Sequence, residues 1–189
     1  MSVQKTTYFE KPGKANTSAV IAAVKGAVAE TGVKHVVVAS TSGATALAFA
    51  KALGNKAQVI AVTYHAGWHG GDVVAIKPQA RKALEKAGIP LVMCSHAFSG
   101  ISRSISRQFG GPNYPELIAA TFKVFGEGIK VALEVSVMAA DAGQVPTDRN
   151  IIAVGGTGSG CDAAVLLRTA HQNSFFTLRV RRIITMVSG

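Results

Sequence analysis

The chain has 189 residues, of which 48% are hydrophobic and 16% are charged, so its composition excludes an intrinsically disordered protein. A chain of this length is expected to form one domain over residues 1–189. Its net charge of +10 favours anionic partners, whether phosphorylated small molecules, nucleotides or nucleic acid. No run approaches the roughly 18 apolar residues of a membrane span. Residues 1–15 lack the apolar segment of a signal peptide, so we expect a cytoplasmic protein without a membrane anchor.

Helical and extended patterns alternate through the first half of the chain. Val20, Val24 and Val28 recur every fourth residue and predict one apolar face of a helix. The run HVVVA has no polar face, which indicates a strand buried on both sides. The expected elements are a helix over 17–31, a strand over 35–39, a helix ending at 53, a strand over 58–63, a helix over 78–87 and a strand over 89–94.

The second half begins with a long connection, expected over 95–114, whose length is typical of a functional loop. A helical stretch then opens at Pro115, with Gly126 and Gly128 as candidate breaks, and ends near Gly143. Strands are expected over 150–154, 163–167 and 178–187. The last two are too close together for a helical crossover, so they predict an antiparallel pair. The whole pattern predicts an α/β three-layer sandwich with a mostly parallel sheet.

The turn after the first buried strand is the strongest candidate for a binding site. Its hydroxyl groups and its glycine open a helix, where free backbone N–H groups and the helix dipole attract anions. We interpret it as a phosphate-binding loop, although an ordinary capped helix start has the same residue types. The residues of this loop are Ser40, Thr41, Ser42, Gly43, Ala44 and Thr45.

A second glycine-rich segment, GGTGSG over 155–160, follows the fourth buried strand. It lies too late in the chain for a Rossmann dinucleotide fingerprint. Gly156, Thr157 and Gly158 either line a ligand crevice or form a plain flexible turn. Asp162 is a candidate acceptor for a sugar or a ring, and equally a turn residue that bonds its own backbone.

The segment TYHAGWHGGD over 63–72 combines aromatic, imidazole and glycine residues. Thr63, His65, Gly67 and Trp68 are interpreted as a wall for a flat ligand, and the alternative is a surface loop in which an exposed Trp68 contacts the domain or a partner subunit. His65 and His69 have a spacing that suits zinc on a helix. In a glycine-rich loop without a third ligand, we expect no metal site.

Other catalytic apparatus is missing from the sequence. No Ser-His-Asp or Cys-His order is persuasive, and Cys94 and Cys161 form neither a C-x-x-C motif nor an expected disulfide framework. There is also no phosphate loop of the kinase or NTPase type, so the catalytic residues are unknown. Arg103 and Arg107 in the expected connection are candidates for gripping a phosphate or a partner chain, or are simply solvated.

The segment over 36–63 resembles the opening of the pyruvate kinase C-terminal domain, and the segments over 64–67, 125–143 and 151–167 resemble stand-alone proteins of the same domain type. This resemblance implies the pyruvate kinase C-terminal-like fold, a phosphate pocket at residues 40–45 and a homo-oligomer. Kinase activity is not implied, because the catalytic barrel of that enzyme has no counterpart here. Ala44 stands where those enzymes often carry a long polar residue, which weakens the case for a sugar bisphosphate.

The stand-alone group also implies flavin mononucleotide (FMN) as a cofactor. Its phosphate suits the 40–45 loop, and its flat ring suits the 63–72 and 155–160 segments. We therefore expect a protein that binds FMN or a similar phosphorylated small molecule. If it is an enzyme, it is a flavin-dependent oxidoreductase. The alternative is a non-catalytic regulatory protein with a sugar phosphate or nucleotide effector. Nucleic-acid binding ranks third, because the basic residues are scattered and aromatic residues are few.

Overall fold

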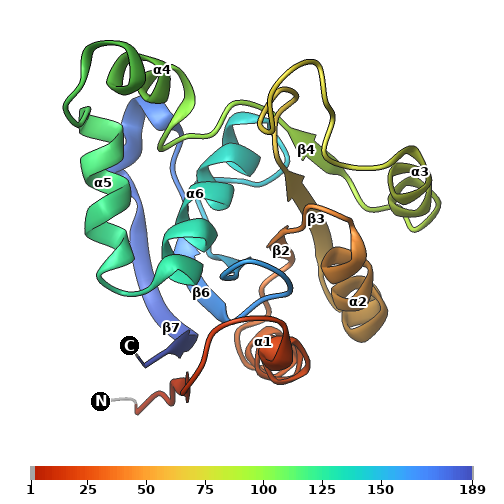
Figure 1. Cartoon of the computed structure of the whole chain (residues 1–189). Coiled ribbons are helices and arrows are strands. Elements are labelled where there is room, and N and C mark those ends of the chain that lie inside the picture. The colour runs from red at the N-terminus through yellow and green to blue at the C-terminus, as the bar shows by residue number, and fades with distance from the viewer. Residues whose placement is uncertain (1–2, 189) are drawn as a thin grey trace.

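The computed structural model describes residues 3–188, and seven strands within that range form one sheet in the order β1-β7-β6-β5-β2-β3-β4 (Figure 1). Every neighbouring pair is parallel except those that involve β6, which runs antiparallel to both β5 and β7. The mostly parallel sheet and the antiparallel C-terminal pair are therefore confirmed. The strands are β1 (Thr7–Phe9), β2 (His35–Ala39), β3 (Gln58–Thr63), β4 (Leu91–Met93), β5 (Ile151–Gly155), β6 (Ala163–Arg168) and β7 (Arg179–Val187).

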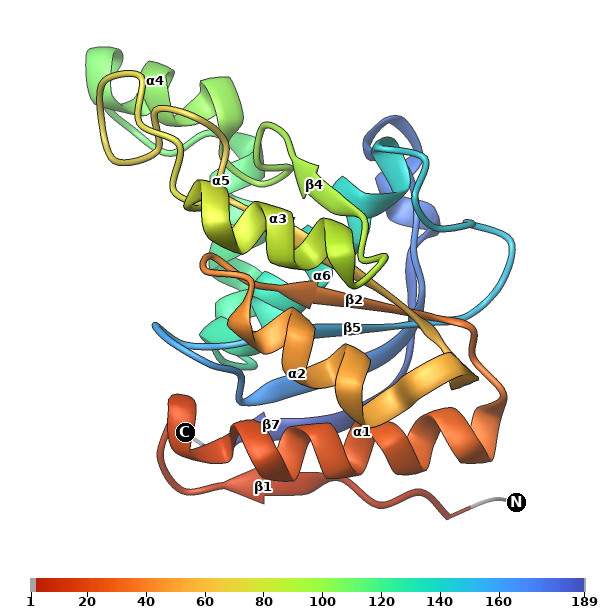
Figure 2. The same ribbon diagram turned by 90° about the vertical axis from the view of Figure 1, so that its right-hand side faces the viewer.

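Helices cover both faces of the sheet and produce the expected three layers (Figures 1 and 2). One face carries α1, α2 and α3. The other face carries α6, with α5 packed against α6 and α4 next to α5. The helices are α1 (Thr17–Thr31), α2 (Ala44–Leu53), α3 (Pro78–Lys86), α4 (Gly100–Phe109), α5 (Tyr114–Lys123) and α6 (Glu127–Asp141), with short 3₁₀ turns at Lys14–Asn16, Gly54–Lys56 and Gln172–Thr177.

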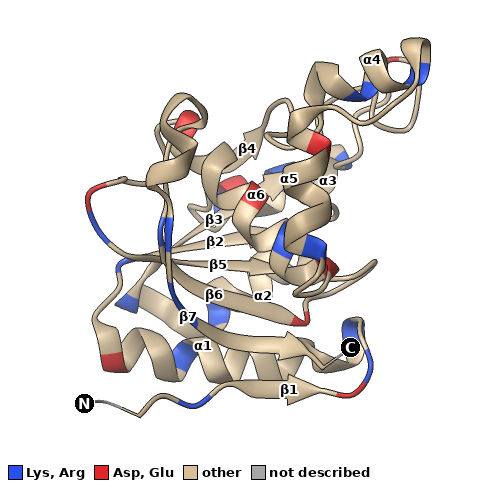
Figure 3. Ribbon diagram, turned by 90° about the vertical axis from the view of Figure 1, so that its left-hand side faces the viewer, with Lys and Arg blue, Asp and Glu red and all other residues tan. Residues whose placement is uncertain are grey.

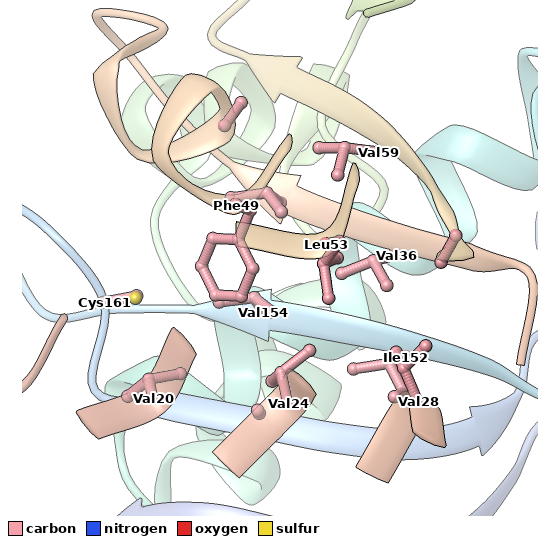
Figure 4. Packing of buried hydrophobic residues seen from close by; sticks show 14 of the residues in the cluster. Val20, Val24, Val28, Val36, Phe49, Leu53, Val59, Ile152, Val154 and Cys161 are labelled. Carbon is pink, nitrogen blue, oxygen red and sulfur yellow. The ribbon is translucent and has the colours of Figure 1, made fainter. Parts of the chain in front are cut away.

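The apolar stripe of α1 forms one side of the first core. Val20, Val24 and Val28 are buried and belong to the same cluster as Ile152 and Val154 of β5 (Figure 4). Burying an aliphatic side chain of this size contributes about 1.5–3 kcal/mol relative to leaving it exposed. This burial explains why a helix with alanine and glycine on its outer face is held firmly against the sheet.

The second core lies under α6, whose residues from Gly128 to Ala140 are almost all buried. Leu133 and Met138 pack against Val37 and Ile151 of the sheet within one cluster. A helix that is apolar on nearly every side is normally covered on more than one side, and α5 supplies the second cover here. This helix also carries a buried glutamate, which belongs to the site described below.

The structure corrects the expected 95–114 connection, because this segment contains α4. Its serines and flanking glycines favour a loop in sequence, yet Asn113 and Glu116 form a capping box at the start of α5. The side chains of Ser106 and Asn113 also hydrogen-bond each other across the α4–α5 turn, and Ser106 bonds Glu116 as well. These contacts between the two helices fix a segment whose local composition does not predict a helix.

Candidate functional site

A cavity of about 590 Å³ opens at the carboxyl ends of the central parallel strands. Ala39 at the end of β2 and Thr63 at the end of β3 line it, together with Gly156 directly after β5. Open α/β sheets bind ligands at this edge because the loops that leave parallel strands converge there. The volume lies within the range of small-molecule sites, roughly 300–1,000 Å³.

The 40–45 loop forms one wall of this cavity and leads into α2. The Oγ atom of Ser40 accepts the Ala46 N–H at 3.4 Å, and that of Ser42 accepts the Ala44 N–H at 3.5 Å. Both contacts are long for hydrogen bonds, so they satisfy the first amides of α2 weakly. The helix start therefore retains donors and a positive dipole end beside the cavity.

Within the 40–45 loop, the structure places the four hydroxyl residues Ser40, Thr41, Ser42 and Thr45 on the cavity. Gly43 and Ala44 do not line it. Gly43 has a φ of 79°, and a Cβ added there would lie 3.3 Å from Cδ1 of Leu84 on α3. Glycine therefore serves the turn and the packing of α3, and Gly43 itself does not line the cavity.

An aromatic cluster forms a second wall. The rings of Tyr64 and Trp68 stack with centroids 4.8 Å apart and planes 4° from parallel. His96 lies 4.4 Å from Trp68, and His65 packs edge-on against both Trp68 and His96. Trp68 is partly buried in this cluster, so it packs on its own domain, as the alternative interpretation of this loop allows.

Arg103 of α4 reaches over the Trp68 ring, with its guanidinium carbon 4.3 Å from the centroid. Two other cations line the cavity, and both are paired: Lys123 lies 2.9 Å from Glu127, and Lys130 lies 2.6 Å from Glu134. Among residues 3–188, Arg103 has no carboxylate within salt-bridge distance. It is therefore the cavity cation whose charge is left for a ligand.

Glu134 anchors the floor of the site from the middle of α6. It is 4% exposed, and its Oε1 accepts the backbone N–H of Phe98 at 2.9 Å while its Oε2 pairs with Lys130. Burial of the neighbouring His96 lowers the pKa of that imidazole to about 4, with the Lys130 and Arg103 charges acting in the same direction and the Glu134 charge opposing them. His96 is therefore neutral at pH 7.

The 155–160 loop forms the remaining wall, where Gly156 and Gly158 line the cavity. The packing at its start is close: a Cβ on Gly155 would lie 2.1 Å from the carbonyl oxygen of Gly128, and one on Gly156 would lie 2.6 Å from that of Gly160. These two glycines are needed for the contact of β5 with α6 and for the tight turn. The exposed tip of the loop, Gly158 and Ser159, lines the cavity.

Thr157 and Asp162 lie outside the main cavity and line a smaller one of about 340 Å³. Asp162 is fully buried, and its Oδ2 accepts the backbone N–H groups of Gly13 at 2.9 Å and Thr157 at 3.0 Å. Its carboxylate thus ties the glycine loop to the N-terminal segment. The contacts of Oδ2 are those of the turn interpretation, while the buried Oδ1 has no hydrogen-bond partner among residues 3–188.

His65 and Gly67 also lie off the cavity surface. Nδ1 of His65 is 2.6 Å from the carbonyl oxygen of Ala66, and the N–H of Gly67 donates to Val73 at 2.9 Å. The first orients the imidazole, and the second closes the loop. Among residues 3–188, no three His, Cys, Asp or Glu side chains gather as a metal site.

The cavity residues that the sequence did not predict include Tyr64, His96, Lys130 and Glu134. Glu134 had a signal, because it and Lys130 are the two charged residues in a largely apolar helical pattern over 129–140 and are spaced for an i, i+4 pair. His96 had none, since it comes to Trp68 only through the parallel pairing of β3 with β4.

The fold and the cavity define a three-layer α/β domain with a ligand-sized site at the carboxyl edge of its sheet. The sequence model of the pyruvate kinase alpha/beta domain family matches residues 18–166, and the chain belongs to that family. This stretch includes β2 to β5, the 40–45 loop and most of the cavity wall. Within residues 3–188, no helix has both the length and the apolar character needed to cross a bilayer.

Proposed function

We propose that the protein binds FMN or a similar phosphorylated small molecule in the 590 Å³ cavity. The observation that carries this proposal is that the 40–45 loop and the Arg103–Trp68 pair line the same cavity. An anion-binding helix start and a planar cationic group beside an aromatic surface match a ligand with a phosphate and a flat ring.

The phosphate end is assigned to the 40–45 loop. The hydroxyl groups of Ser42 and Thr45 and the weakly satisfied amides of α2 would donate to phosphate oxygens. Arg103 adds a full positive charge and two parallel N–H donors, without first having to break a salt bridge. Both α2 and α4 are regular helices of ten residues, so these donors are held on rigid elements.

The ring end is assigned to the aromatic wall of Tyr64, Trp68 and His96. A neutral His96 accepts a hydrogen bond at one ring nitrogen and donates one at the other, which suits the polar edge of a heterocycle. When bound, FMN supplies redox chemistry, whereas the protein orients the ring and sets its electrostatic surroundings. Any reaction would therefore be a flavin-dependent oxidoreduction.

Trp68 is the single tryptophan of the chain, so its fluorescence reports on the cavity directly. We expect FMN to quench this emission saturably. In the Ser42→Ala/Thr45→Ala variant, the affinity should fall by about 1–3 kcal/mol, or roughly 5- to 150-fold, through lost charge-assisted hydrogen bonds. A matched control is Ser174→Ala/Thr177→Ala, because these exposed residues lie in the 3₁₀ turn before β7.

Equal FMN affinity in the wild type and in the loop variant would contradict the placement of the phosphate. No binding by the wild type would contradict FMN as the ligand. Riboflavin, which has the ring but not the phosphate, separates the two ends: the proposal requires it to bind more weakly than FMN and to respond little to the loop substitutions.

A second candidate is a regulatory protein whose effector is a sugar phosphate without an aromatic ring. It is favoured by the stacking of Tyr64 on Trp68, because each ring already covers part of the surface that a flavin would use. In this case, a sugar phosphate shifts the Trp68 emission in competition with inorganic phosphate, and FMN does not. The loop variant should then lose the response to the sugar phosphate.

A further inference from the structure

Helix α4 exposes an apolar stripe that no other part of residues 3–188 covers. Ile101, Ile105 and Phe109 are 80%, 41% and 79% exposed. Their spacing of four residues places them along one side of the helix. Most amphipathic helices turn such a stripe toward the core, whereas this helix turns it toward solvent.

The charges of α4 lie on its opposite side. At about 100° per residue, Arg103 and Arg107 are each about 160° from the line of the stripe around Ile105. The contact of Arg103 with Trp68 confirms this direction, because it faces the cavity. Ser104 and Gln108 lie along one side of the stripe. Along the other side lies Ser106, which bonds Glu116 of α5, so the apolar surface and its border carry no cation.

The position of α4 leaves the stripe accessible, since the helix stands at the outer end of the molecule, away from the sheet (Figures 2 and 3). Around the α4–α5 turn, Tyr114 is 85% exposed, and Leu117 follows one turn later at 47%. At roughly 150–250 Å² for an aromatic side chain, Phe109 and Tyr114 alone expose on the order of 350 Å². With the aliphatic side chains, the patch approaches the roughly 800 Å² that each partner contributes to a standard interface.

We propose that a second copy of this chain covers the stripe, with the two α4 helices packed antiparallel about a two-fold axis beside Ile105. Ile101 of one copy then meets Phe109 of the other, so the stripe is complementary to itself, as a two-fold interface requires. Two chains of net charge +10 repel each other. An interface without cations, with both arginines turned away, keeps that repulsion small.

An acidic partner protein is the alternative occupant of the stripe. The absence of cations around the stripe argues against it. Such a partner is recognised by cations at the rim of an apolar patch. The rim here carries the uncharged Ser104 and Gln108 on one side and the acidic Glu116, bonded to Ser106, on the other. The structure therefore favours association of identical chains through α4.

Light scattering during size-exclusion chromatography tests the proposal. The wild type should have twice the chain mass of 19.5 kDa. Ile105→Glu places two carboxylates against each other at the two-fold axis and should give 19.5 kDa, with an unchanged circular dichroism spectrum. The matched control Arg107→Glu makes a larger charge change on the other side of the same helix and should remain a dimer.

Disulfide cross-linking is a second measurement, which tests the same interface even if the Ile105→Glu variant does not fold. Ile105→Cys places two thiols at the axis and should form a disulfide-linked dimer on mild oxidation, whereas Arg107→Cys should not. A monomeric wild type at the highest concentration tested overturns the proposal. So does an oligomer whose mass is the same in Ile105→Glu, or cross-linking that is equal in the two cysteine variants.

Discussion

Replacing Glu134 with glutamine should destabilise the protein and, at the same time, strengthen its binding of anions. The Glu134 and Lys130 side chains are only 5% and 12% exposed, and their charged atoms lie 2.6 Å apart. Removing one member of a buried ion pair typically costs 3–5 kcal/mol because the other charge is left without compensation. Glutamine keeps an oxygen for the Phe98 N–H, so we expect a loss of about 2–4 kcal/mol.

Urea denaturation and thermal unfolding measure this loss, which for a chain of this size corresponds to a fall in Tm of about 5–15 °C. Lys130→Met removes the other partner, and the double variant should be destabilised by less than the sum of the two single ones. In Glu134→Gln, the released Lys130 charge should also tighten phosphate binding, as followed by Trp68 emission. An unchanged Tm together with additive single effects would refute the reasoning about the pair.

Three further predictions concern packing, pH and thiol chemistry. Gly155→Ala forces a Cβ to 2.1 Å from a backbone oxygen and should cost at least about 3 kcal/mol, whereas Gly26→Ala, with open space in α1, should gain about 0.5–1 kcal/mol in denaturant titrations. Because the pKa of His96 is lowered to about 4, the unfolded chain binds one proton more than the folded chain between pH 6.5 and 4. The free energy of unfolding should therefore decrease as the pH is lowered through that window, and His96→Gln should reduce this pH dependence. Burial raises the pKa of Cys161 to about 12, so a thiol reagent at pH 8 should label Cys94 alone until the protein is denatured.

Each of these predictions has a clear contrary result. Equal unfolding midpoints for Gly155→Ala and Gly26→Ala would mean that the close contact between β5 and α6 is not rigid. A His96→Gln variant with the same pH dependence as the wild type would assign the acid sensitivity to other groups. Rapid labelling of two thiols in the folded protein would contradict the burial of Cys161.

The layers of the fold were readable from the sequence because each buried strand lies next to a glycine-marked helix boundary. The apolar run over 35–39 predicted a strand covered on both faces, and the valines of α1 predicted a helix with one buried stripe. Both predictions were confirmed. Strand β1 was missed because three residues hold no pattern of their own, and its partner β7 lies at the other end of the chain. Helix α4 was missed because contacts with α5 stabilise it against its local composition.

The candidate site likewise has a part that the sequence predicted and a part that it did not. The hydroxyl loop over 40–45 could be predicted as part of the candidate site, since a helix start that follows a buried strand is defined by neighbouring residues alone. The cluster of His96, Arg103 and Glu134 around Trp68 joins three separate segments, and no spacing in the sequence brings them together. Asp162 shows the limit of local patterns: a carboxylate beside a glycine loop does not reveal that its Oδ2 bonds backbone amides 149 and 5 residues away.

The pairing of β1 with β7 also constrains the order of folding. Thr7 pairs with Thr185 and Phe9 with Val187 in a parallel register, so β1 has no place in the sheet until β7 has formed on β6. Contacts that distant in sequence form late, because a long loop must close before they contribute. We therefore expect the edge formed by β1 to close last during folding. The same three residues should be the first to lose amide protection when the native sheet opens in hydrogen exchange.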